Sequence, residues 1–229
     1  MPEDNNGSGH RERVRASYVR GGLDSWEEYA VLELILFYSI ARRDTKQLAK
    51  DLIKKYGSLS GVFDAPYESL VNFPGVGERT ASLLKLLLDV SRRYSISKVS
   101  AHDVLDSAEK AGDYISAHFV GLTNEQVFIL CLDGKNKVLY DGFISSGTVN
   151  LASVSARTVA ELALLHRASS VILAHNHPNG FAIPSEKDRV ATLKIFTTLK
   201  AVGIPLLDHI IVVPDDYVSM AQSGFFSNK

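Results

Sequence analysis

The feature that most constrains the fold is a change in hydrophobic periodicity near residue 100. From Ser25 to about Tyr94, apolar residues recur at the three- and four-residue spacing of amphipathic helices. After that point, apolar runs of strand length alternate with helical patterns. A chain of 229 residues is long enough to bury two modest cores. We therefore predict an all-helical domain over residues 17–98 and an α/β domain over residues 99–229.

The helical half contains at least three predicted helices, over residues 25–40, 45–57 and 78–94. Gly57 is placed where a glycine commonly ends a helix, and prolines and glycines mark the short connections. Residues 1–16 are charged and rich in Gly, Ser and Asn, with nothing to bury. We expect them to form a disordered tail.

The second half alternates strands with helices. Two strands over residues 127–133 and 138–145 are predicted to form a hairpin with its turn at Asp133-Gly134. A helix over residues 156–166, a strand over 170–175, a helix over 185–203 and a strand over 206–213 follow. This order favours an α/β sandwich in which helices cover a sheet.

Composition narrows the possible partners. The formal net charge is −1 at pH 7, so the chain has no bulk field for holding nucleic acid or anionic lipid. The single cysteine, Cys131, lies in an apolar strand pattern and cannot form an internal disulfide. No apolar run resembles a signal peptide or a membrane span. We expect a soluble cytoplasmic protein without a membrane partner.

The segment His175-Asn176-His177 follows the predicted strand 170–175, at the strand end where open α/β sheets place their sites. Two histidines at i and i+2 of an extended chain project to the same side. Asp188 follows His177 after ten intervening residues, in the first turn of the next predicted helix. Two imidazoles and a carboxylate suit Zn²⁺ with a fourth position open to water.

The same residues also fit a purely structural role. Ser185 and Asp188 have the spacing of a capping box, in which Ser185 caps the helix and Asp188 favours its positive end. Both roles can hold at once, and ligand spacing alone leaves the metal site open.

The wider motif resembles a known family. His175, His177, Ser185 and Asp188 stand in the order H-x-H-x7-S-x2-D, which is similar to the signature of the JAMM (MPN+) metalloproteases. The stretches ILAHNHPNG, IPSEKD and LLDHIIVV resemble the RadC-like branch in particular. The resemblance covers nearly the whole chain, because RadC-like proteins also carry a helical helix-hairpin-helix region like residues 25–95. It implies a JAMM/MPN (cytidine-deaminase-like) sandwich that holds Zn²⁺ on the two histidines and the aspartate.

The resemblance also implies two catalytic residues. JAMM metalloproteases use a glutamate on an early strand as general base on the zinc-bound water, and the matching residue here is Glu125. Ser185 would steady the developing oxyanion through its hydroxyl. The alternatives are a solvated glutamate at a strand end and a serine that only caps a helix. His209, in LLDHIIVV, could support the site without binding the metal or be an ordinary hydrogen-bonded strand-end histidine; we favour the second role and leave His209 out of the site.

The hairpin Gly75–Gly77 enters a helix and would expose backbone N–H groups there. The helix-hairpin-helix resemblance implies that Gly75 and Gly77 contact a DNA phosphate, helped by Arg79 or Lys85. Residues 1–98 carry 15 Lys and Arg against 13 Asp and Glu, a net of +2. DNA binding by this unit alone would therefore be weak. The alternative is a turn used for packing.

Three functions follow from these observations. The first is a zinc-dependent hydrolase, a metallopeptidase or isopeptidase acting on a peptide or isopeptide substrate. The second is a DNA-binding protein associated with repair or recombination. The third is a non-catalytic MPN scaffold, although such scaffolds typically lack the ligand residues present here. Zinc nucleobase deaminases are excluded because they need more cysteine ligands than one cysteine supplies.

Overall fold

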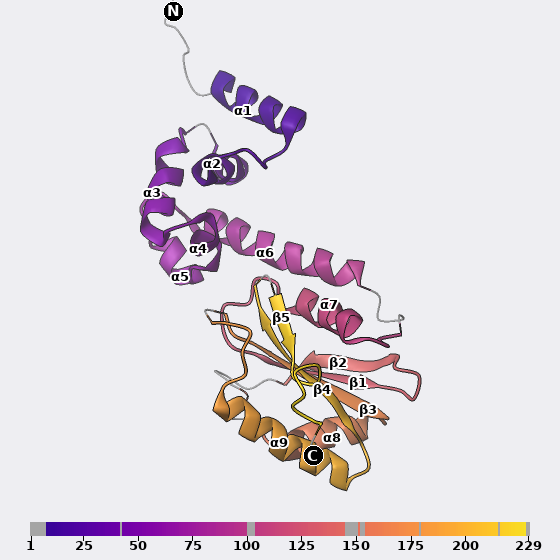
Figure 1. Cartoon of the computed structure of the whole chain (residues 1–229). Helices are drawn as coiled ribbons and strands as arrows, with labels where there is room; N and C mark the ends of the chain where they lie inside the picture. The colour runs from indigo at the N-terminus through magenta and orange to yellow at the C-terminus, as the bar shows by residue number, and fades with distance from the viewer. Residues whose placement is uncertain are drawn as a thin grey trace, which may run out of the picture. The chain divides into compact units, whose positions relative to one another are not determined.

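The computed structural model describes residues 8–41, 43–99, 104–144, 151, 154–178, 180–214 and 216–227. The chain divides into two compact units, residues 1–90 and 91–229 (Figure 1). The division falls inside one long helix, α6 (Glu78–Lys98). Across the described residues, no helix combines the length and the apolar character needed to cross a membrane.

The first unit is all-helical, as the periodicity predicts. The three predicted helices are present as α2, α3 and α6, and Gly57 ends α3 with a φ of +90°. Leucines on the inner faces of these helices form the core, with Leu32, Leu36 and Leu52 fully buried. The helices before α6 are α1 (Ser8–Gly21), α2 (Glu28–Ser39), α3 (Lys46–Tyr56), α4 (Leu59–Asp64) and α5 (Tyr67–Val71).

The predicted tail is wrong for residues 8–16, which form the first part of α1. This helix packs through charged side chains instead of an apolar stripe. The Arg11 guanidinium lies 4.7 Å from the centroid of the Phe37 ring, and His10 Nε2 lies 2.8 Å from Glu33 Oε1. Hydropathy alone does not reveal such contacts, which is why the composition suggested disorder. Residues 1–7 lie outside the described residues.

The second unit contains a five-stranded sheet in the order β2-β1-β3-β4-β5. Strands β3 and β4 are parallel, and the other neighbouring pairs are antiparallel. The predicted hairpin is present as β1 and β2, with the left-handed position at Asn136 (φ 58°) rather than at Gly134. The strands are β1 (Val127–Leu132), β2 (Val138–Phe143), β3 (Ser170–Asn176), β4 (Leu206–Val213) and β5 (Asp216–Ser219).

Helices cover both faces of this sheet, which confirms the mixed α/β class (Figure 1). Helices α8 (Ala156–Leu165) and α9 (Glu186–Ala201) pack on one face, against Val171 and Leu173 of β3. Helix α7 (Ala108–Phe119) packs on the other face, against Ile172 and Ala174. The sequence pattern predicted neither α7 nor β5.

The alternation along β3 decides where the site lies. Val171 and Leu173 face α8 and α9, so the odd-numbered positions of β3 point toward that layer. His175 continues the same parity. The connection from β3 through α9 to β4 then returns the chain to the sheet beside β3. The fold therefore brings together one face of β3, the start of α9 and the middle of β4.

Candidate metal centre

The two histidines of the motif lie at the end of β3, on the side that faces α9. His175 is the last residue but one of the strand and is 2% exposed. His177 follows the strand, and its backbone N–H donates to the carbonyl of Val212 in β4. Its side chain is 18% exposed. The prediction that both rings point to one side is confirmed, because their Nε2 atoms lie 3.0 Å apart.

Asp188 is held at the start of α9 by the predicted capping box. Its carboxylate oxygen Oδ2 accepts from the backbone N–H of Ser185 at 2.8 Å and from the Ser185 hydroxyl at 2.6 Å. Ser185 Oγ in turn accepts from the backbone N–H of Asp188 at 3.2 Å. The cap therefore fixes the carboxylate through Oδ2 and leaves Oδ1 directed toward His175.

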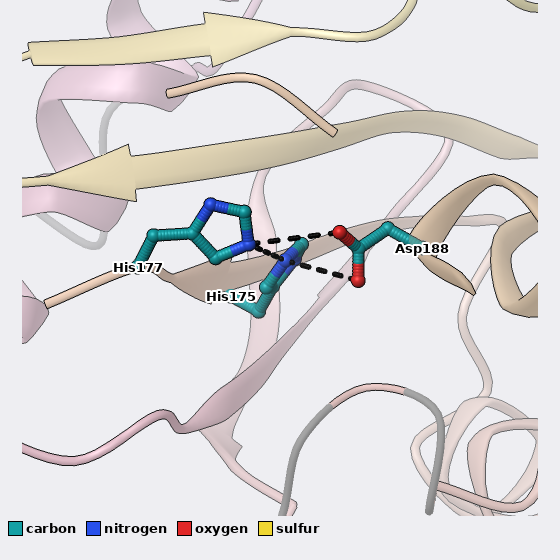
Figure 2. Close-up of side chains that lie close together, drawn as sticks. All are labelled: His175, His177 and Asp188. Atoms are coloured by element: carbon teal, nitrogen blue, oxygen red, sulfur yellow. Dashed lines mark hydrogen bonds and ion pairs between the residues drawn. The ribbon is translucent and has the colours of Figure 1, made fainter. Parts of the chain in front are cut away.

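Figure 2 shows how the three side chains converge. His175 Nε2 lies 3.4 Å from Asp188 Oδ1, and His177 Nε2 lies 3.6 Å from Asp188 Oδ2. Each residue offers one ligand atom, and these atoms all lie within 4.8 Å of one another. Such a triad can hold a metal ion.

The hydrogen bond of His177 shows that its inward nitrogen is an acceptor. Its Nδ1 lies 2.9 Å from the carbonyl oxygen of Phe181. A carbonyl only accepts, so the proton of the neutral ring is on Nδ1 and the lone pair is on Nε2. That lone pair faces the Nε2 atom of His175 and the Asp188 carboxylate. A cation between the three groups satisfies all of them at once, whereas a single proton satisfies one contact.

The electrostatics of Asp188 agree with a cationic centre. Burial alone would raise the pKa of this carboxyl group. Hydrogen bonds with His175 and Ser185 outweigh burial and hold the pKa well below its usual range. Asp188 is therefore ionised at neutral pH and supplies a charged ligand atom.

Of the two roles considered for His209, its contacts favour support of the site, so the preferred role of an ordinary strand-end histidine is wrong. It is fully buried in β4, and its Nε2 lies 2.8 Å from Nδ1 of His175. Its other nitrogen, Nδ1, lies 2.6 Å from the hydroxyl of Thr192. Burial lowers the pKa of His209 well below its ordinary value, so the ring is neutral at neutral pH.

Thr192 is a second residue that the sequence analysis missed. Its hydroxyl donates to the backbone carbonyl of Asp188 at 2.6 Å. The available signal was its spacing, because a residue four positions after Asp188 lies on the same face of the helix. For His209, the signal was a histidine within the apolar strand pattern LLDHIIVV.

Glu125, the predicted general base, precedes β1 and is exposed. Val127 pairs with His175, so the segment leading into β1 runs beside the end of β3. Asn176 fixes this segment: its side chain accepts from the N–H of Gln126 at 2.7 Å and donates to the carbonyl of Asn124 at 3.1 Å. Within the described part of the chain, Glu125 makes no hydrogen bond or ion pair, and its catalytic role stays a prediction.

The residues predicted to contact DNA belong to the helical unit. The connection from α5 to α6 contains Gly75, with a φ of +90°, and Gly77. Arg79 is exposed in the first turn of α6. Lys85 is less available than predicted, because its ammonium group donates to the carbonyl of Phe63 at 2.6 Å and burial lowers its pKa.

The fold and the ligand set define an α/β domain with a His-x-His…Asp centre at the end of a central strand. The profile of the RadC-like JAB domain family matches residues 105–225, which contain the whole triad. The chain belongs to this family. A similar protein is the UPF0758 protein SPO0054 of Ruegeria pomeroyi, which is 36% identical over 216 residues, or 94% of this chain and 96% of that protein. The predicted RadC-like resemblance is thereby confirmed.

Proposed function

We propose that the protein is a RadC-like zinc-dependent hydrolase that cleaves a peptide or isopeptide bond. The observation that carries the proposal is the convergence of two imidazole Nε2 atoms and a carboxylate on one point, with their ligand atoms within 4.8 Å. Two nitrogens and one oxygen are the donor set of catalytic rather than structural zinc sites. Membership of the RadC-like JAB domain family supports the same type of centre.

Bound zinc would supply Lewis acidity, which polarises a carbonyl group and makes water a usable nucleophile near neutral pH. Around it, the chain's own residues would orient the ligands. Asp188 is fixed by the cap at Ser185, and His177 is fixed by the carbonyl of Phe181. His177 is partly exposed, so a substrate can reach this side of the centre.

Glu125 would take a proton from the attacking water and return it to the leaving amine. Its support is its place in the segment that Asn176 holds beside the end of β3. The hydroxyl of Ser185 donates to Asp188, so its first role is to position that ligand. Stabilisation of an oxyanion by the same hydroxyl is a further proposal that requires it to turn away from Asp188.

Metal content tests the centre directly. Mass spectrometry of the purified protein is expected to find about one zinc ion per chain, and the His175→Ala, His177→Ala double variant is expected to carry none. A wild-type protein that stays metal-free after zinc is supplied and the excess removed would contradict the proposal.

Hydrolysis tests the chemistry. Peptide and isopeptide libraries are incubated with zinc-loaded wild-type protein and with Glu125→Gln. The general base hypothesis predicts that Glu125→Gln keeps the metal but loses roughly 100-fold or more in rate. Glu186→Gln, which changes an exposed acid at the start of α9, is the matched control. Equal loss in both variants would remove the special role of Glu125.

DNA binding by the helical unit is a second proposal, and one arrangement favours it. The guanidinium nitrogens of Arg43 lie 3.5 Å from the point where a Cβ on Gly75 would stand. A cationic group thus borders the turn whose N–H groups precede α6. Retention on DNA at increasing salt is compared between wild type and the Gly75→Ala, Gly77→Ala variant. Identical elution would end this proposal.

A further inference from the structure

The buried chain of polar groups behind His175 has only one consistent arrangement of protons. It runs from the backbone carbonyl of Asp188 to Thr192, then to His209, then to His175. The successive distances are 2.6, 2.6 and 2.8 Å, and Thr192 and His209 are fully buried. Each contact must therefore join one donor to one acceptor.

The backbone carbonyl of Asp188, at one end of this series, fixes the positions of the protons. The carbonyl of Asp188 only accepts, so the single proton of the Thr192 hydroxyl points to it. The Thr192 oxygen then accepts from Nδ1–H of His209. Donation by Thr192 to the Met220 sulfur, 3.9 Å away, would leave its oxygen against the carbonyl at 2.6 Å with no proton between them. Sulfur is also the weaker acceptor.

The proton positions also decide which nitrogen of His175 is available to a metal. A neutral His209 with its proton on Nδ1 has a lone pair on Nε2, which must accept from Nδ1–H of His175. Nδ1 of His175 therefore carries a proton, which leaves Nε2, the atom that faces His177 and Asp188, as the nitrogen that can bind a metal. We propose that Thr192 and His209 are positioning residues that hold His175 in its metal-binding tautomer.

This series of hydrogen bonds also connects two of the proposed metal ligands, Asp188 and His175. Asp188 supplies the carboxylate on one side of the centre, and its backbone carbonyl sets the tautomer of His175 on the other. The start of α9 therefore orients two ligands, one directly and one through β4. This role is distinct from packing, because it depends on the hydroxyl of Thr192 and not on its shape.

We call the hydrogen-bonded series from the Asp188 carbonyl through Thr192 and His209 to His175 the relay. Its effect on zinc rests on the proposed metal site, so the test measures the relay and zinc binding separately. Long-range proton–nitrogen NMR of the metal-free full chain reports which nitrogen of His175 carries the proton. Wild type is expected to carry a proton on Nδ1, bonded to His209, whether or not Nε2 also carries one. Thr192→Val keeps the side-chain shape but removes the acceptor for His209, so His209 moves its proton to Nε2 and donates to His175. Nδ1 of His175 is then expected to lose its proton, and zinc affinity to fall by roughly 10–100-fold.

Two further variants control for structural damage. Thr192→Ser keeps the hydroxyl and is expected to retain the wild-type tautomer and zinc affinity. Thr197→Val removes another hydroxyl of α9, which also donates to a backbone carbonyl four residues earlier but has no hydrogen bond to His209. This variant is expected to behave as wild type.

Each outcome bears on one of the two proposals. A wild-type His175 without a proton on Nδ1, or Thr192→Val with unchanged Nδ1 protonation and zinc affinity, overturns the relay. If Thr192→Val unfolds, the wild-type spectrum alone decides. A wild type with the expected tautomer but no zinc binding retains the relay and contradicts the proposed metal function.

Discussion

Two clusters in the α/β unit each bring a histidine ring to an aspartate, and they differ in how their hydrogen bonds close. On the α7 face of the sheet, His118, Asp141 and Tyr114 form a closed set: Nε2 of His118 and the hydroxyl of Tyr114 both lie near Asp141 Oδ2, at 3.1 and 3.0 Å. Nδ1 of His118 lies 2.9 Å from the carbonyl of Tyr114. All three contacts join a donor to an acceptor when both ring nitrogens of His118 carry a proton, as in an imidazolium paired with the Asp141 carboxylate.

In the cluster on the α9 face, the hydrogen-bond donors and acceptors do not match. His177 and Asp188 direct acceptor atoms toward His175, and the N–H of His177 is turned away toward Phe181. Protons complete the first cluster, whereas the second has more acceptors than protons. Counting donors and acceptors thus distinguishes a closed histidine cluster from one that can accept a metal ion, which residue type and burial alone do not.

The largest expected effect comes from placing the same substitution in each cluster. Asp188→Asn removes the charge of one ligand, and we expect zinc affinity to fall by more than roughly 100-fold. Asp141→Asn leaves the ligands untouched and is expected to bind zinc as wild type does. Competition with a chromophoric chelator measures both affinities. Equal losses in the two variants would break the comparison.

The reverse effect is expected on the stability of the metal-free sheet. Asp141→Asn replaces an acceptor of two hydrogen bonds and should destabilise the sheet by about 1–3 kcal/mol. Asp188→Asn should change it by less than about 1 kcal/mol, because the amide oxygen can keep the cap. Hydrogen exchange of the amides in β1 and β3 measures the opening free energy of the sheet. The only tryptophan, Trp26, lies in the helical unit, and its fluorescence should be unchanged in both variants.

The contribution of Asp141 should depend on pH with a defined sign. The hydrogen bond from His118 is the largest cause that lowers the pKa of Asp141, and the bond from Tyr114 adds to it. Burial raises the pKa of Tyr114, which therefore remains a donor. A lowered pKa stabilises the folded state above the unfolded value near 3.9, and this stabilisation is lost as pH falls through the folded value.

The advantage of wild type over Asp141→Asn should accordingly be complete near pH 6 and shrink below about pH 4. Denaturation followed by circular dichroism at several pH values, with Trp26 fluorescence as the signal of the other unit, tests this expectation. An advantage that grows as pH falls would mean that Asp141 is not the acceptor of the cluster.

The parts of the fold and site that were predictable are those set by local sequence. The parity of β3 placed His175 and His177 on one side, and the spacing of the cap placed Asp188 in the first turn of α9. The family of the chain followed from the same short motif. These features depend on residues within about one strand or one helical turn of each other.

The parts that were missed depend on contacts between distant segments. His209 meets His175 only because β3 and β4 pair in parallel with Leu173 opposite His209. Helix α1 is held by a guanidinium over the Phe37 ring and by an ion pair, which hydrophobic periodicity does not register. A single sequence contains the residues for such contacts but not the register that joins them.

The smallest expected effect is a change in sheet stability on removal of His177, because acceptors outnumber protons in the α9 cluster. In the metal-free protein, the lone pair of His177 faces the Nε2 atom of His175 at 3.0 Å and the charged Asp188. His177→Ala removes this acceptor and a partly exposed ring, so we expect the opening free energy of the sheet to change by no more than about 0.5 kcal/mol. With saturating zinc, wild type should gain stability by mass action and the variant should not. Hydrogen exchange of β3 amides with and without zinc measures both quantities. A large loss in the metal-free variant would show that protons alone complete this cluster, as they do around Asp141, and that its histidines are structural.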